Sequence, residues 1–460
     1  MIQIIVQDAS WCKVMKHPDH WDTVWDILSY TQWEKNRIDG RNEKVKRSFF
    51  DRRGGKFGTG LLSYLKKHLD MKGEKYKIKN KSDPYSLEVK KTVKFKNISF
   101  EDYQKRILNI LNKEHRTGIF QAPTGSGKSI ITAGIIEKLN RPATIIVVPR
   151  TTIAKGMRNA LQKTLNQPIG MIGQNIFEPE YITVVLYQSL QNLNLKSLNK
   201  TLEAVIIDEA HLAPIKIKEI LEHLPDVYYR FGLTATAITK DDRKNWLAVT
   251  SQLGKVLTKV DDEEAKSRVT DVDAYMAKIK LKQTQDDYND IFKHDIILNK
   301  QFNELLIHLA DTALDIKENC LLLVDHYEQA KLLKSIAKKR IAKDLQPVVV
   351  YSKTPGHVQD KLIKDLSNSK VKFVIATPVW GVGTDIPGVE SIVLGSARKK
   401  KSTTLQKIGR GRRRTNKKGN LLLLDVYIDM GLKDRFFQKY SIKRMDLYTK
   451  NGWFRGFLDD

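Results

Sequence analysis

A glycine-rich segment at residues 122–129, Ala-Pro-Thr-Gly-Ser-Gly-Lys-Ser, constrains the fold of this chain more than any other feature. It directly follows the apolar run Gly118–Gln121 and opens the helical pattern Ser129–Leu139. A strand, a glycine loop and a helix in this order are typical of a phosphate-binding loop of the Walker A type, here with Ala122 in place of the usual first glycine. The segment therefore predicts a parallel sheet whose crossover helices begin at its carboxyl edge.

The residue types of this loop suit phosphate chemistry. Gly125 and Gly127 let backbone N–H groups close around phosphates, and the N-terminus of the following helix adds positive potential. Lys128 is expected to reach the β- and γ-phosphates, and the hydroxyl of Ser129 is expected to bind Mg²⁺. The loop residues that we assign to nucleotide binding are Thr124, Gly125, Ser126, Gly127, Lys128 and Ser129.

An acidic pair ends a second apolar run. Asp208 and Glu209 begin the sequence Asp-Glu-Ala-His directly after the run Leu202–Ile207, about 80 residues after the glycine loop. The carboxyl ends of parallel strands meet at one edge of a sheet, so we expect these carboxylates to face the phosphate-binding loop. Asp208 would bind Mg²⁺, and Glu209 would orient and deprotonate the attacking water.

Similar apolar runs, rich in β-branched residues, recur in two series. Continuous apolar strands are buried on both faces, which is typical of parallel sheets covered by crossover helices. We therefore expect the α/β fold class, with two parallel-sheet domains in tandem. Between about residues 241 and 290 the pattern fades into a charged stretch that predicts helix. The runs lie at residues 118–123, 143–149, 182–187, 202–210 and 229–237, and then at 319–326, 346–352, 371–378, 391–397 and 420–427.

Charge distinguishes the beginning of the chain from the rest. From Lys35 to Lys81 there are 16 Lys+Arg against 5 Asp+Glu, with phenylalanines and tyrosines interleaved, which indicates a small basic α+β domain. The tail is basic and aromatic, and its first part is predicted to be helical. The expected division is an N-terminal accessory, DNA-binding domain at 1–95, a first ATP-binding domain at 96–245, a connecting segment at 246–295, a second domain at 296–430 and the tail at 431–460.

Composition narrows the class of partner. The chain carries 80 Lys+Arg against 53 Asp+Glu, a formal net charge of +27, which points to a polyanion and most simply to nucleic acid. Its two cysteines, Cys12 and Cys320, are too few and too far apart for a disulfide framework or a zinc site built mainly from thiolates. No apolar run approaches the roughly 18–20 residues that span a bilayer, and the start lacks a secretion signal, so we expect a cytoplasmic protein.

Taken together, four motifs resemble those of superfamily two helicases of the DEAH type over about residues 98–430. The chain is most similar to the XPB/UvsW-type branch, which includes compact phage recombination helicases, and residues 53–62 resemble the N-terminal domain of that branch. The resemblance implies two RecA-like domains that sandwich ATP, with nucleic acid crossing both. The motifs are Gly-Ser-Gly-Lys-Ser at 125–129, Asp-Glu-Ala-His at 208–211, Leu-Thr-Ala-Thr-Ala at 233–237 and Gln-Lys-Ile-Gly-Arg-Gly-Arg-Arg at 406–413.

The resemblance adds residues to the expected ATP site. Gln104 would read the adenine edge, because its amide can donate and accept at once. Gly383 and Asp385 would approach the ribose and the Walker A loop. Arg410 and Arg413 would stabilise charge on the transferring phosphoryl group, since a guanidinium is always charged and can bind phosphate bidentately. Which of Arg410, Arg412 and Arg413 is the arginine finger stays open.

The resemblance also implies residues that link ATP hydrolysis to movement along nucleic acid. Their small hydroxyl and amide groups would contact phosphates without reading sequence. Coupling between the two sites is assigned to His211, Thr234, Thr236 and Gln406. Contacts to the nucleic-acid backbone are assigned to Pro149, Arg150, Thr151, Gln188, Ser189 and Thr377.

These features together predict an ATP- and Mg²⁺-dependent helicase or translocase that acts on branched or single-stranded DNA, such as forks and recombination intermediates. We expect it to act as a monomer beside recombination or replication proteins, in the cytoplasm of a bacterium or a phage-infected host. Three alternatives remain open: an RNA helicase, a duplex translocase that drives a nuclease complex, and an ATP-switched nucleic-acid clamp or annealing factor.

Overall fold

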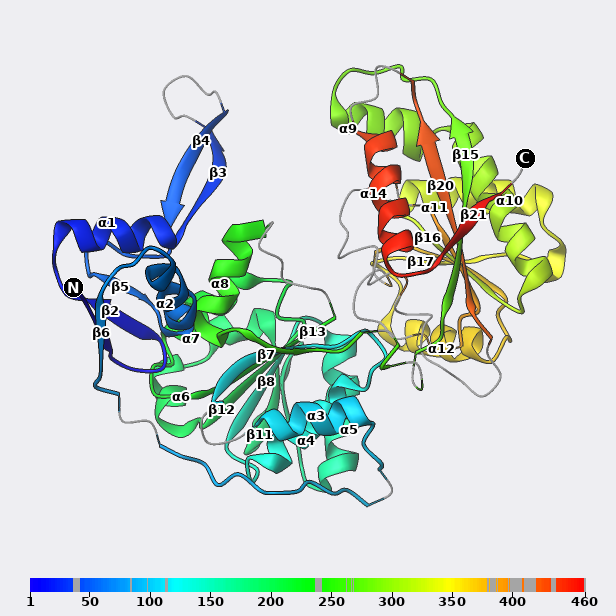
Figure 1. Ribbon diagram of the computed structural model, residues 1–460. Coiled ribbons are helices and arrows are strands. Elements are labelled where there is room, and N and C mark those ends of the chain that lie inside the picture. Colours follow the sequence, from blue (N-terminus) through cyan, green and yellow to red (C-terminus); the bar gives the residue numbers. More distant parts are fainter. Residues whose placement is uncertain are drawn as a thin grey trace. The chain divides into compact units, whose positions relative to one another are not determined.

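The described part of the chain divides into two compact units, residues 1–123 with 127–261 and residues 124–126 with 262–460 (Figure 1). No helix within the described ranges is long and apolar enough to cross a membrane. The computed structural model describes residues 1–35, 42–82, 85–96, 98–111, 115–235, 242–261, 263–265, 267, 269–378, 380, 386, 388–395, 397, 408, 419–431 and 436–458.

Residues 1–82, which we call the N-terminal domain, fold around a small mixed sheet. Its described strands follow the order β5-β2-β1-β6, and β1 pairs antiparallel with β2 and parallel with β6. Apolar side chains of the sheet and of two helices form its core, so the expected α+β domain is present. The elements are β1 (Ile2–Val6), β2 (Trp11–Val14), α1 (Pro18–Ile27), β5 (Lys56–Gly58), the 3₁₀ helix η1 (Thr59–Leu61), α2 (Leu62–Met71) and β6 (Tyr76–Asn80).

A β-hairpin extends from this domain (Figure 1). It consists of β3 (Ser29–Lys35) and β4 (Asn42–Ser48), which pair antiparallel from Ser29 opposite Ser48 to Lys35 opposite Asn42. Side chains alternate between the two faces of such a ribbon. The hairpin therefore presents two different faces, and neither is needed to complete the small sheet, to which β3 and β4 do not belong in the described pairing.

The N-terminal domain packs directly on the first large sheet domain through helix α8 (Arg243–Leu253). Leu247 of α8 is fully buried within the N-terminal core. Gly60 permits this close approach, because a Cβ there would lie 2.1 Å from the carbonyl oxygen of Thr250. The buried guanidinium of Arg230 also donates to Ser10 Oγ at 2.9 Å. The two parts are thus joined by buried contacts through α8 and Arg230.

The first large sheet carries the glycine loop. Among the described residues its strand order is β10-β9-β11-β8-β12-β13-β7-β14, with antiparallel pairing only between β10 and β9. Apolar residues of α7 and α8 cover one face. The strands are β7 (Thr117–Gln121), β8 (Thr144–Val148), β9 (Gly170–Gly173), β10 (Ile176–Glu178), β11 (Ile182–Leu186), β12 (Ala204–Asp208), β13 (Tyr229–Thr234) and β14 (Val256–Lys259). The other helices are α3 (Asp102–Ile110), α4 (Lys128–Lys138), α5 (Thr151–Leu165), the 3₁₀ helix η2 (Tyr187–Asn192), α6 (Leu195–Thr201) and α7 (Pro214–Glu222).

The second large sheet has the order β17-β18-β16-β19-β20-β15-β21 over the described residues, and its pairs are parallel. Leu306 and Leu333 belong to the core on one face, and Leu366 and Leu447 to the core on the other. The strands are β15 (Val272–Lys280), β16 (Cys320–Leu323), β17 (Val348–Val350), β18 (Phe373–Ala376), β19 (Ser391–Leu394), β20 (Leu421–Asp429) and β21 (Phe454–Leu458). The helices are α9 (Tyr288–Asp290), the π-helix η4 (Ile291–Ile297), α10 (Lys300–Ile316), α11 (Tyr327–Arg340), the 3₁₀ helix η5 (Lys343–Leu345), α12 (Gly356–Ser367) and α14 (Phe437–Lys450).

The charged stretch at about 241–290 differs from its prediction. Helix α8 is present, but β14 and β15 are strands, so the prediction of helix is wrong for them. The residues of β14 are partly or fully exposed at the edge of the first sheet, and β15 alternates buried and less buried residues over much of its length. Neither strand produces the continuous apolar run that identified the central strands. In the tail, helix α14 confirms the predicted helix.

Candidate active site at the carboxyl edge of the first sheet

Five neighbouring parallel strands, in the order β11-β8-β12-β13-β7, bring distant motifs to one edge. Asp208 ends β12, Thr234 ends β13, and the glycine loop follows β7. The backbone N–H of Ala122, at the start of that loop, donates to the carbonyl of Thr234 at 2.9 Å. The sheet therefore aligns the acidic motif, the Thr-Ala-Thr element and the loop along one line, as expected for carboxyl ends of parallel strands.

The glycine loop has the backbone conformation that its sequence requires. Gly125 has φ +90°, and Gly127 has φ +79° at the N-cap of α4. Positive φ at these values is costly for residues with a Cβ, which explains glycine at both positions. Helix α4 begins at Lys128, so the first backbone N–H groups of the helix directly follow the loop. Such a helix start is a favourable place for a phosphate group.

Lys128 and Glu209 form a largely buried ion pair. Lys128 Nζ lies 3.2 Å from Glu209 Oε1, and the two side chains are only 11% and 12% exposed. Burial would raise the pKa of Glu209, but Lys128 and His211 outweigh it, so the pKa is lowered and the carboxylate stays charged. Glu209 also has φ +51°, a strained conformation for a residue with a side chain. The phosphate-binding ammonium and the proposed base are thus held together.

Asp208 lies next to this pair, and its pKa is shifted in the opposite direction to that of Glu209. Burial raises the pKa of Asp208 to about 7, the neighbouring Glu209 adds to the rise, and Lys128 opposes it. One oxygen, Oδ1, accepts the backbone N–H of Glu209 at 3.0 Å. A buried carboxylate beside a second one is the environment that a divalent cation compensates. The residues present therefore fit Mg²⁺ together with a triphosphate.

A polar chain leads from Glu209 to β13. His211 Nδ1 lies 2.7 Å from Thr234 Oγ1 and 3.4 Å from Glu209 Oε2. The N–H of Ala235 also donates to Glu209 Oε2 at 3.4 Å. Burial lowers the pKa of His211, Lys128 contributes to the same direction, and Glu209 opposes it. The structure thus brings together two of the expected coupling residues, His211 and Thr234, with the proposed base.

Gln104 is fully buried near the start of α3. Its Oε1 accepts the backbone N–H of Glu101 at 3.1 Å, which is half of a capping box, and its Nε2 lies 3.5 Å from the Tyr103 hydroxyl. A capping box satisfies backbone donors at the helix start. This glutamine therefore has a structural role in the helix that precedes the nucleotide loop.

The residues expected to contact the nucleic-acid backbone in this unit lie on neighbouring strands of the same edge. Pro149 and Arg150 follow β8, and Thr151 begins α5. Gln188 and Ser189 lie within η2, directly after β11. The pairing of Val148 with Leu186 places these two groups side by side. They occupy the part of the edge beyond β12, whereas the nucleotide loop follows β7.

In the second sheet, Thr377 follows β18 and its N–H donates to the carbonyl of Val350 at 3.0 Å. Strand β18 lies between β17 and β16, and each of these strands is followed by a tyrosine near the same edge. Tyr351 and Tyr327 stack with ring centroids 4.1 Å apart and an interplanar angle of 17°. This pair was not predicted from the sequence, although Tyr351, directly after the apolar strand β17, was a visible signal.

Several expected site residues lie outside the described ranges. They are Thr236, Gly383, Asp385, Gln406, Arg410 and Arg413.

Asp208→Asn is expected to stabilise the protein while it removes the proposed Mg²⁺ ligand. Asp208 binds its carboxyl proton more tightly in the folded protein than in the unfolded chain. The stability that protonated Asp208 contributes is therefore complete below about pH 4 and is lost as pH rises through about 7. Asparagine keeps an oxygen for the Glu209 N–H without a charge. We expect the free energy of unfolding at pH 8 to rise by about 1 kcal/mol or more.

Urea denaturation without nucleotide measures this effect. At pH 4 the variant and the parent should have nearly equal free energies of unfolding. The exposed control Asp286→Asn should match the parent at both pH values. A variant that is less stable than the parent at pH 8 would contradict the assignment.

Two RecA-like parallel sheets, one of which carries this loop and acidic pair, define a P-loop nucleoside triphosphatase of the helicase type. Family models agree with that class. Residues 97–239 match the family described as "Type III restriction enzyme, res subunit", and residues 300–415 match "Helicase conserved C-terminal domain".

Individual proteins are similar over most of the chain. "Putative helicase 22" of the Sulfolobus islandicus filamentous virus is 28% identical over 86% of this chain and 77% of its own length. The "DNA 3'-5' translocase XPB2" of Sulfurisphaera tokodaii is 26% identical over 71% of this chain and 81% of its own length. The structure of a single-substitution variant of Saccharomyces cerevisiae Dbp5 bound to RNA and ADP BeF3 shares the fold, with a TM-score of 0.55, 18% identity and coverage of 89% of this chain and 95% of that one. The chain is an ATP-dependent superfamily two helicase, and its relatives include an XPB-type translocase.

Proposed function

We propose that this chain is an ATP-dependent DNA helicase or translocase that remodels or unwinds branched DNA, such as forks and recombination intermediates. The observation that carries the proposal is the continuous polar chain from Lys128 through Glu209 and His211 to Thr234. It links the nucleotide loop to the strand that bears the Thr-Ala-Thr element. An ATP site connected in this way to the sheet is suited to converting hydrolysis into movement.

At the ATP site each residue has a distinct task. Lys128 and the N-terminus of α4 bind the phosphates, which releases Glu209 from its ion pair. Glu209, charged and held beside His211, then orients the attacking water and accepts its proton. Ser129 and Asp208 would hold Mg²⁺, which when bound neutralises charge on the phosphates.

Further roles rest on the match to the helicase motifs. Gln104 would contact adenine, and Gly383 and Asp385 would lie near the ribose. Arg410 and Arg413 would supply the guanidinium that stabilises the transferring phosphoryl group, an effect worth about 10³-fold or more in rate. Gln406 and Thr236 would join His211 and Thr234 in coupling hydrolysis to movement.

The nucleic-acid path in this proposal follows the carboxyl edges of the sheets. In the first sheet, small hydroxyl and amide groups after β8 and β11 would contact phosphates. In the second sheet, Thr377 would do the same, and the adjacent Tyr327 and Tyr351 provide an aromatic surface for a base or sugar. The contacts proposed for the first sheet are Pro149, Arg150, Thr151, Gln188 and Ser189.

Branched DNA is proposed as the substrate because the chain carries a second basic part besides the helicase sheets. Residues 1–95 would form the DNA-binding accessory domain. The buried contact of Leu247 and the hydrogen bond from Arg230 to Ser10 fix the N-terminal domain to the first sheet. A grip fixed in this way can hold one arm of a branch while the motor moves along another. The similar XPB2 protein is named a DNA 3'-5' translocase.

Steady-state ATPase measurements with different nucleic acids test the proposal. We expect forked or single-stranded DNA to stimulate turnover most strongly, and Glu209→Gln to remove the stimulated activity by about 10²–10⁴-fold. Strand-separation assays on forks would then follow. RNA-only stimulation would identify an RNA helicase, and duplex-only stimulation a translocase motor for a nuclease complex. Absence of stimulation by every nucleic acid would favour an ATP-switched clamp.

A further inference from the structure

One face of the β3–β4 hairpin combines exposed aromatic and basic side chains in an unbroken row. The pairing places Trp33 opposite Lys44 and Thr31 opposite Lys46, so these residues lie on the same face of the ribbon. Lys44 Nζ lies 5.3 Å from the centre of the Trp33 ring. Lys46 Nζ lies 5.1 Å from the centre of the Trp25 ring.

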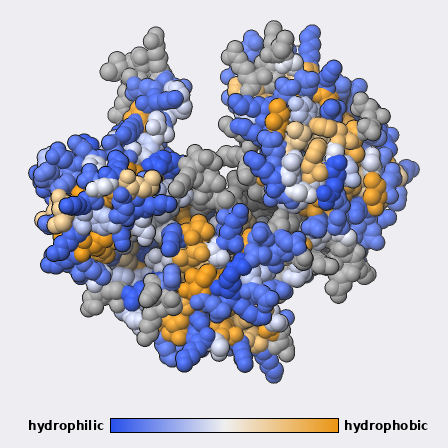
Figure 2. Space-filling model, viewed as in Figure 1, coloured by the Kyte–Doolittle hydropathy of each residue, from blue (hydrophilic) through white to orange (hydrophobic). Residues whose placement is uncertain are grey.

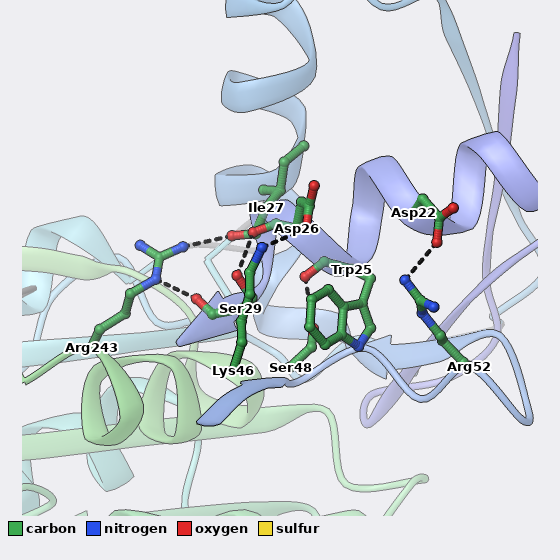
Figure 3. A network of polar contacts seen from close by, with 9 residues as sticks. All are labelled: Asp22, Trp25, Asp26, Ile27, Ser29, Lys46, Ser48, Arg52 and Arg243. Atoms are coloured by element: carbon green, nitrogen blue, oxygen red, sulfur yellow. Dashed lines mark hydrogen bonds and ion pairs between the residues drawn. The ribbon is translucent and has the colours of Figure 1, made fainter. Parts of the chain in front are cut away.

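The row continues from the hairpin to Trp25 of α1 and to Arg52 in the loop after β4 (Figure 3). The guanidinium of Arg52 lies 4.8 Å from the centre of the same Trp25 ring that Lys46 contacts. Asp26 holds Lys46 at 2.7 Å, and Asp22 pairs with Arg52. We call this surface, formed by Trp25, Trp33, Lys44, Lys46 and Arg52, the hairpin face.

The hairpin face points away from the body of the first unit. On the opposite face of the ribbon, Tyr30 packs on Phe49, and Lys244 of α8 lies over its ring at 5.9 Å. Arg243 of α8 donates to the carbonyls of Ile27 at 2.7 Å and Ser29 at the root of the hairpin (Figure 3). The hairpin is therefore fixed to α8 through one face, and the hairpin face is left available to a partner.

Accessibility and charge identify the kind of partner. Trp33 is 65% exposed, more than a tryptophan that serves packing requires, and hydrophilic residues cover most of the viewed face of the hairpin (Figure 2). Lys46 and Arg52 are each 51% exposed, and ion pairs that are this accessible to water are weak, so phosphates can replace the carboxylates at little cost. Lysines beside an accessible indole are typical of sites that bind phosphates and stack bases.

We propose that the hairpin face binds a nucleic-acid strand with unpaired bases, with a base stacked on Trp33 and phosphates on Lys44, Lys46 and Arg52. Bases inside a duplex already stack on their neighbours, so an indole finds a free base only on a single strand or at a junction. The proposal rests on the proposed function and refines it, because it makes the N-terminal domain a reader of the unpaired part of a branch rather than of the duplex arm.

Binding measurements on the full-length protein test the stacking. Trp33→Ala should weaken the binding of a labelled single DNA strand by about 5- to 150-fold, the equivalent of ~1–3 kcal/mol for one stacked base. The binding of a blunt duplex of equal length should weaken by less than about twofold. Trp33→Phe should keep most of the affinity because a ring remains. Phe177→Ala, which removes an aromatic residue that is 70% exposed on β10, is the matched control and should change neither affinity.

Salt dependence tests the phosphate contacts. Lys44→Ala and Lys46→Ala should each reduce the slope of log K against log salt for the single strand by about 0.7. If Trp33→Ala weakens the binding of single strand and duplex equally, the proposal is overturned in favour of a site that grips the duplex. Unchanged binding of both would also overturn it. These substitutions are at the surface, so melting temperatures should stay within about 2 °C of the parent.

ATPase assays separate this inference from the proposed function. Trp33 is not part of the candidate active site, so Trp33→Ala should keep the parent's ATPase rate without nucleic acid. If the parent is stimulated by nucleic acid and Trp33→Ala binds single strands normally, only the hairpin inference fails. If no nucleic acid stimulates the ATPase activity of the parent, the proposed function itself fails.

Discussion

Lys128→Ala is expected to reduce ATP turnover by at least about 100-fold, because it removes the charged donor that binds the β- and γ-phosphates. DNA binding at low salt should stay within about threefold of the parent, since one charge of a net +27 is lost and the proposed backbone contacts follow other strands. Steady-state ATPase and anisotropy titrations measure the two effects. Simultaneous loss of hydrolysis and DNA binding would contradict the separation of the two sites.

The ion pair with Glu209 makes a second variant necessary. Removing one partner of a buried pair is strongly destabilising, by about 3–5 kcal/mol, because the other charge stays buried. The double variant Lys128→Ala/Glu209→Gln removes both charges, so it should regain stability and remain inactive. Lys163→Ala, an exposed change of the same charge in the last turn of α5, should keep full activity.

Removal of residues 1–82 is expected to leave a protein that is largely unfolded or insoluble. Leu247 of α8 would lose the core that buries it, at a cost of about 1.5–3 kcal/mol. Arg230, fully buried, would lose its hydrogen bond to Ser10, worth about 1.5–3 kcal/mol for a charged donor. Together these losses, about 3–6 kcal/mol, reach the lower end of the stability of a typical domain, about 5–15 kcal/mol. Soluble yield and melting temperature measure the result.

A shortened hairpin is the control for this truncation. Replacing residues 33–44 by Asn-Gly would close the ribbon at the paired residues Gln32 and Val45 and keep the N-terminal core. This variant should fold with nearly the parent's melting temperature. A soluble 83–460 fragment that melts within about 3 °C of the parent would show that the contact with α8 contributes little.

Local sequence patterns predicted the α/β class and the chemical core of the candidate site. The apolar runs identified the central strands because a strand that is buried on both faces needs apolar residues at consecutive positions. The loop at 122–129 and the acidic pair at 208–209 were visible because each is contiguous and directly follows such a strand. Strand β14, at the edge of the first sheet, and strand β15, between β20 and β21 in the second, were missed because partial exposure lets charged residues interrupt the run.

The sequence by itself thus determined which residues carry phosphate chemistry and that two parallel sheets support them. Only the tertiary structure decided that Lys128 pairs with Glu209, that His211 joins Thr234, and that Trp33 stays exposed on a ribbon fixed by Arg243. The physical reason is separation along the chain: Ser10 and Arg230 are 220 positions apart, yet they share a buried hydrogen bond. Local patterns report how deeply a segment is buried, whereas such contacts depend on which segments pack together.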